Sequence, residues 1–151
     1  MKRMIACALA LMTLAAVAAA PPARAVRDPG TLIVAQEAEP VGLDVTRSSL
    51  QTTMSVCYNI QDTLFHPQDD ASVTGALAEK WEKVDDLTWK ITLRKGATFH
   101  NGEPVDAEAV KFSLARIQDP KLESPHRGKV EIFTEVKVLD PLTFTISTKQ
   151  P

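Results

Sequence analysis

The sequence predicts a mixed α/β fold of the α+β kind. Residues 50–64 repeat apolar side chains every three or four positions, which is typical of a helix with one buried face. Residues 89–94 instead alternate apolar and polar side chains, which is typical of a half-buried strand. The chain has 151 residues, of which 44% are hydrophobic and 24% charged, so one ordinary globular domain is expected.

The first 25 residues have the layout of a secretory signal peptide. Lys2 and Arg3 precede an apolar run over 4–20, and Ala23-Arg24-Ala25 supplies the small-x-small cleavage pattern. The apolar run is shorter than the roughly 20 residues that a membrane-spanning helix needs, which favours a cleaved signal over an uncleaved anchor. We therefore expect cleavage after Ala25 and export of residues 26–151.

The charge of the mature chain excludes some partners. Cleavage would remove Lys2, Arg3 and Arg24 but no acid, leaving 14 basic residues against 19 acidic ones and a net charge of −5. An acidic chain argues against nucleic acid and against anionic membranes as partners. Only Cys57 would remain, and we expect it to be buried packing rather than a redox or metal-binding group.

The first elements of the mature chain are a strand and a helix. Residues 31–35 are apolar and rich in β-branched side chains, which predicts a strand buried on both faces. A loop with Pro40 and Gly42 follows, and the helix is expected over 50–64. Asp85-Asp86 is expected to turn a hairpin between the ALAEKW segment, which ends at Trp81, and the strand 89–94.

The stretch 93–112 reads as a turn followed by a helix. Asn101-Gly102 predicts a tight turn with positive φ at both positions, and Asp106 predicts a helix N-cap, with Val105 packing on Val110. Asp119-Pro120 should end this helix, because proline cannot continue the hydrogen-bond ladder. A last hairpin is expected over 136–148, with its turn at Asp140-Pro141.

No motif for catalysis or metal binding stands out. His66, His100 and His126 lack the spacing of a metal site, and the acid pairs 69–70 and 85–86 fall in turns. There is no GxSxG elbow, phosphate loop or GxGxxG fingerprint. An anion site at Lys95 and His100 is an alternative to the structural interpretation of 93–112, but turn and cap roles suffice for that stretch. We expect no cofactor and no metal.

A chain of segments nonetheless resembles one family. PVGLD, NIQDTLF, ALAEKW, LRKGATFHNGEPVDAEAVKFSLAR, ESPHRGKV and VKVLDPLTFTISTKQP follow one another over 31–151. In content, order and spacing they resemble the family 5 solute-binding proteins, the dipeptide, oligopeptide and nickel receptors of bacterial ABC importers. Two departures are Val45, where the family usually has proline, and Ala109, where it commonly has an acid.

The resemblance implies part of a larger fold. Members of the family are several times longer and close two lobes around a ligand, in the type II periplasmic-binding-protein fold. We therefore expect residues 26–151 to be part of the first lobe, with a small β-rich subdomain at about 45–151, and expect the chain to be truncated, its second lobe missing.

The resemblance also implies a function, namely capture of peptides or similar small solutes in the periplasm by a monomer that delivers them to an ABC permease and is not an enzyme. By position, the loop after the LD motif nominates Arg47, Ser48 and Ser49 as ligand-binding residues, with Ser49 first, and the SPHRGKV segment nominates His126. Two alternatives stay open: an exported hydrolase, and a non-functional fragment of a binding protein.

Overall fold

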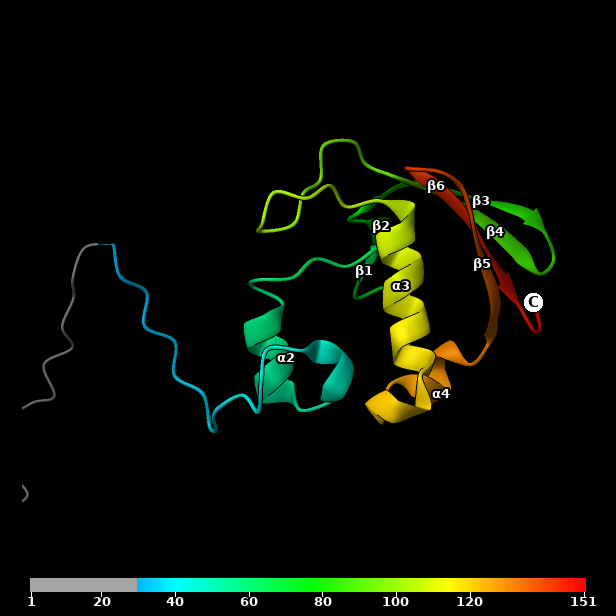
Figure 1. Ribbon diagram of the computed structural model, residues 1–151. Coiled ribbons are helices and arrows are strands. Elements are labelled where there is room, and N and C mark those ends of the chain that lie inside the picture. Colours follow the sequence, from blue (N-terminus) through cyan, green and yellow to red (C-terminus); the bar gives the residue numbers. More distant parts are fainter. Residues whose placement is uncertain (1–29) are drawn as a thin grey trace, which may run out of the picture. The chain divides into compact units, whose positions relative to one another are not determined.

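A computed structural model describes residues 30–151 of the chain, and residues 36–151 form one compact unit (Figure 1). The predicted signal peptide and its cleavage site at Ala25 lie outside the described residues. The helical elements are η1 (Val45–Arg47), α2 (Gln51–Cys57), α3 (Ala107–Gln118), η2 (Pro120–Leu122) and α4 (Arg127–Val130). The strands are β1 (Phe65–Pro67), β2 (Val73–Gly75), β3 (Ala78–Asp85), β4 (Thr88–Leu93), β5 (Phe133–Asp140) and β6 (Thr143–Thr148).

The main sheet is antiparallel with strand order β3-β4-β6-β5, and β1 and β2 form a separate two-stranded hairpin. Both predicted hairpins are confirmed, since β3 pairs with β4 and β5 with β6 across their short turns. The two central strands place Leu93 and Phe144, 1% and 0% exposed, on the face that packs against Ala107 and Val110 of α3. The mixed α/β prediction is therefore confirmed, with the core between α3 and one face of the sheet.

Helix α3 begins and ends where the sequence predicts. The Asp106 carboxylate accepts a hydrogen bond from the Ala109 N–H at 2.8 Å, which satisfies one of the free donors of the first turn. The helix ends at Gln118, with Asp119 as its C-cap and Pro120 next. This fixed end matters for the site, because Arg116 lies in the last turn.

Two predictions for the first part of the chain are wrong. Residues 31–35 form no strand, and Leu32 is 87% exposed, because apolar and β-branched side chains do not by themselves provide the hydrogen-bonding partner that a strand needs. The helix predicted over 50–64 ends at Cys57. There the Asn59 side chain donates to the Ser55 carbonyl at 2.7 Å, in the place of the backbone N–H that would continue the helix. Cys57 itself is fully buried, as predicted.

Two turns show where glycine is required. Gly102 has φ +88° as predicted, but Asn101 keeps a negative φ and instead accepts a hydrogen bond from the Glu103 N–H at 3.1 Å. The expectation of positive φ at both positions is therefore wrong for Asn101, since its side chain closes the turn. At Gly75, a Cβ atom would lie 2.1 Å from the Ala78 carbonyl oxygen, so only glycine permits this approach of β2 to the start of β3.

Candidate functional site

The loop 44–50, which follows the LD motif, is held to the end of α3 by an ion pair. Asp44 Oδ2 accepts from Arg116 Nη2 at 2.6 Å, and Arg116 Nη1 reaches Asp44 Oδ1 at 3.3 Å. The same Nη1 donates to the Thr46 hydroxyl at 2.6 Å, and that hydroxyl donates to Asp44 Oδ1 at 2.6 Å. One guanidinium group therefore binds two loop side chains at once.

Asp44 also shapes the loop locally. Its Oδ1 accepts from the Thr46 N–H at 3.0 Å, which caps η1 at its N-terminus. The hydrogen bond from Arg116, supported by those from Thr46 and opposed by partial burial, holds the pKa of the Asp44 carboxyl well below its ordinary value of 3.8. The same contact raises the pKa of Arg116. The pair is therefore fully ionised at neutral pH.

A second segment holds the same loop through Ser124 and His126. The Ser124 hydroxyl donates to the Thr46 carbonyl at 2.5 Å and accepts from the His126 N–H at 3.2 Å. His126 Nε2 lies 3.0 Å from the Ser48 carbonyl oxygen and must donate to it, because that oxygen can only accept. A neutral His126 is therefore protonated on Nε2 and leaves Nδ1 as an acceptor. Glu123, at φ +54°, ends η2 and directs the chain into this contact.

The loop alternates between anchored and exposed residues. Asp44, Thr46 and Ser48 make the contacts described above, whereas Arg47 and Ser49 are exposed. Ser48 is 6% exposed, and its hydroxyl accepts from the Leu50 N–H at 3.2 Å. We call residues 44–50 with Arg116, Ser124 and His126 the anchored loop.

All four residues nominated from the sequence belong to the anchored loop, but they differ in what they offer. Ser48 and His126 meet each other through the Ser48 carbonyl, so both have a structural task. Arg47 and Ser49 keep their side chains on the surface, where a solute could reach them. Sequence reasoning missed Thr46, Arg116 and Ser124, because their partners lie 70 to 78 residues away in the chain. An arginine near a helix C-terminus is too common a pattern to indicate such a contact.

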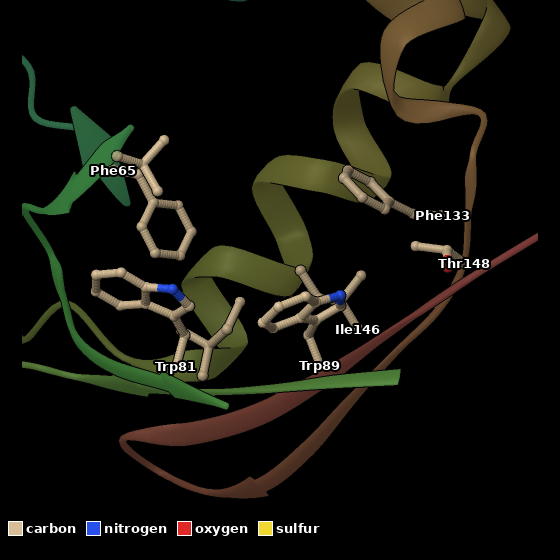
Figure 2. A pocket seen from close by; sticks show the side chains of 8 residues that line it. Phe65, Trp81, Trp89, Phe133, Ile146 and Thr148 are labelled. Carbon is tan, nitrogen blue, oxygen red and sulfur yellow. The ribbon is translucent and has the colours of Figure 1, made fainter. Parts of the chain in front are cut away.

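A separate apolar pocket of about 310 Å³ opens on the sheet. Figure 2 shows its aromatic side chains, among which the rings of Phe65 and Trp81 pack edge to face. The centres of these two rings are 5.1 Å apart. Trp89 belongs to this lining and is 40% exposed, whereas Ile91, two residues further along β4, is buried. The lining contains no charged side chain, and Thr148 is its only polar residue. The anchored loop is therefore the better candidate for contact with a polar solute.

The described residues give no sign of a metal centre or a membrane span. Over residues 30–151, no group of three histidine, cysteine, aspartate or glutamate side chains is arranged to hold a metal ion. No helix within that range is long and apolar enough to cross a bilayer.

Similarity to known proteins identifies the class of protein to which this chain belongs. Residues 72–151 match the model of the family described as bacterial extracellular solute-binding proteins, family 5 Middle. The glutathione-binding protein GsiB of Salmonella paratyphi A is 34% identical over 144 residues, which cover 95% of this chain and 28% of that protein. The chain therefore belongs to family 5 of the bacterial extracellular solute-binding proteins, and it spans less than a third of the length of that relative.

Other relatives and solved structures agree. The probable D,D-dipeptide-binding periplasmic protein DdpA of Escherichia coli is 29% identical over an alignment of 165 positions, gaps included. The alignment covers 97% of this chain and 32% of that protein. The OppA structure from Burkholderia pseudomallei superposes with a TM-score of 0.70 at 25% identity, over 76% of this chain and 26% of that one. The structure of NikZ from Campylobacter jejuni, in complex with Ni(L-His), superposes with a TM-score of 0.68 at 26% identity. The match covers 76% of this chain and 23% of NikZ. The described fold thus matches about a quarter of a solute-binding protein.

Proposed function

We propose that this chain supplies part of the first lobe of a periplasmic solute receptor, which captures peptides or similar small solutes for an ABC importer. Membership of family 5 supports this proposal most strongly, since the relatives named above include a glutathione-binding protein and a probable D,D-dipeptide-binding periplasmic protein. Residues 26–151 would form the lobe part, with a small β-rich subdomain at about 45–151. A signal peptide ending at Ala25 would direct export, and the receptor would act as a monomer that meets its permease in the inner membrane.

The anchored loop is proposed as the solute-contacting surface. Exposed Arg47 and Ser49 offer a cation and a hydroxyl, which suit the carboxylate and the main-chain groups of a short peptide. Ser48 and His126 are proposed to contribute through the loop's shape, and His126 also through Nδ1. A receptor needs rigid hydrogen-bonding surfaces that two lobes can close on, and a loop fixed at Asp44, Thr46 and Ser48 meets that need.

The test is a chimaera in which residues 36–151 replace the matching part of OppA from Burkholderia pseudomallei, with peptide binding measured by calorimetry. The chimaera should bind peptides. Ser49→Ala and Arg47→Ala should each weaken binding about fivefold, which corresponds to one lost hydrogen bond of about 1 kcal/mol. Ser113→Ala is the matched control, since Ser113 is exposed on α3 and its hydroxyl donates only to the Ala109 carbonyl. A folded chimaera that binds no peptide would contradict the proposal.

The same proposal states that the chain is not an enzyme. The sequence has no GxSxG elbow and no histidine close to Ser48-Ser49 along the chain, and solute capture requires no nucleophile. The purified 151-residue chain should therefore turn over neither peptide nor ester substrates. Reproducible turnover that disappears on substitution of one serine or one acid would favour an exported hydrolase instead.

A further inference from the structure

We propose that Arg116 is the positioning residue of the anchored loop, which it acts on through Asp44 and Thr46. Arg116 lies in the last turn of α3, about seventy residues along the chain from the loop, and its guanidinium group makes three hydrogen bonds to loop side chains. No other described side chain binds both Asp44 and Thr46. The inference rests on the proposed function only in naming this loop as the solute-contacting one.

The loop depends on such contacts because its own backbone provides little order. Its only regular element is η1, a single turn of three residues, and Ser48 after it is extended. No described strand pairs with residues 44–50. The loop's shape is therefore set where it touches other segments, at Asp44, Thr46 and Ser48.

Arginine suits this role better than lysine would. The planar guanidinium group presents parallel N–H donors, so it can face both oxygens of Asp44 while the same Nη1 reaches the Thr46 hydroxyl. Helix α3 holds the arginine firmly, since the helix is capped at Asp106 and packed on the sheet through Val110. The rigid core therefore fixes the loop through one side chain.

The consequence for binding concerns Arg47 and Ser49. Arg47 lies between Thr46 and Ser48, and Ser49 follows Ser48, so both are next to residues that the hydrogen bonds hold in place. The backbone at both exposed positions is therefore fixed, and their side chains start from defined places on the surface. With Arg116 removed, the loop would still be tied through Ser124 and His126 but would lose its hold on η1. Arg47 would then be presented to a solute from a mobile turn, at an added entropic cost of binding.

The test measures amide hydrogen exchange by NMR in the 151-residue chain. The reporters are the amides of Thr46 and Arg47, which donate to Asp44 Oδ1 and to the Asp44 carbonyl. Arg116→Gln should speed their exchange at least about tenfold while leaving the core amides of Ile91 and Phe144 unchanged. The control is Arg94→Gln, which removes another surface arginine–aspartate pair, Arg94 to Asp62 at 3.0 Å, far along the chain from the loop.

A rescue variant separates positioning from general damage. Asp44→Arg combined with Arg116→Asp restores opposite charges across the same contact. Exchange of the Arg47 amide, whose acceptor is the backbone carbonyl of residue 44, should therefore be slower than in either single variant. The Thr46 amide is not a reporter in this variant, because arginine at position 44 removes its acceptor. The proposal would be overturned if the loop amides exchanged at the same rate in Arg116→Gln as in the Arg94→Gln control. It would also be overturned if Arg116→Gln accelerated the exchange of loop and core amides equally. The measurement contains no solute, so its outcome is independent of whether the OppA chimaera binds peptide.

Discussion

Replacement of Ser124 by alanine should weaken the attachment of the anchored loop without touching its exposed residues. The residue Ser124 is only 8% exposed. Its hydroxyl donates to the Thr46 carbonyl at 2.5 Å and accepts from the His126 N–H at 3.2 Å. Each such bond contributes about 0.5 to 1.5 kcal/mol net, and alanine leaves both partners unsatisfied in a poorly hydrated place. Ser124→Ala should therefore lower the free energy of unfolding by about 2 kcal/mol.

Urea unfolding followed by tryptophan fluorescence measures this loss, since Trp81 and Trp89 lie on β3 and β4. With a denaturant slope of about 2 kcal/mol per molar, the midpoint should fall by about 1 M. Ser113→Ala is the control, because it also removes one hydroxyl but from the exposed face of α3, and should leave the midpoint almost unchanged. Equal midpoints for the two variants would refute the reasoning.

Three further predictions concern the core, a close backbone approach and pH. Phe144→Ala should lower the free energy of unfolding by about 3 to 5 kcal/mol, because the ring is fully buried. Leu139→Ala, at a half-exposed site, should lower it by less than about 1 kcal/mol, and urea midpoints measure both losses. Gly75→Ala should cost about 1 to 3 kcal/mol in thermal unfolding, since its Cβ would meet the Ala78 carbonyl, whereas Gly128→Ala, with open space, should not destabilise. The lowered pKa of Asp44 means that the unfolded chain takes up this proton first, so the contribution of Asp44 is complete at neutral pH and is lost as pH falls below about 4. Asp44→Asn should abolish that part of the acid dependence, seen as a smaller drop in urea midpoint from about pH 7 to about pH 2.5; a drop equal to that of the parent chain would contradict the assignment.

Local signals predicted the two hairpins of the main sheet and both ends of α3, but not the small hairpin of β1 and β2 or the short helix α4. The alternation in β4, the Asp106 cap and the Asp119-Pro120 stop are each properties of a few adjacent residues, and each appears where expected. The strand predicted at 31–35 failed for the opposite reason, because a strand exists only with a partner and periodicity says nothing about partners. The helix predicted to reach residue 64 failed because the Asn59 side chain competes with the backbone at its end.

The candidate site was predictable only through resemblance. Nothing in the pattern around Ser49 indicates binding, and its nomination depended on the position of the loop after the LD motif. The contacts that hold this loop involve Arg116 and Ser124, which lie 70 to 78 residues further along the chain than their partners. Such long-range side-chain contacts cannot be derived from spacing in one sequence.

The most direct measurement of the central claim is a crystal structure of the OppA chimaera with a bound peptide. We expect the peptide to lie against the anchored loop, with a polar atom within about 3.2 Å of the Ser49 hydroxyl or the Arg47 guanidinium group. We also expect the Asp44–Arg116 pair to be intact in that complex. A peptide bound with both Ser49 and Arg47 beyond reach, even through one bridging water, would contradict the account.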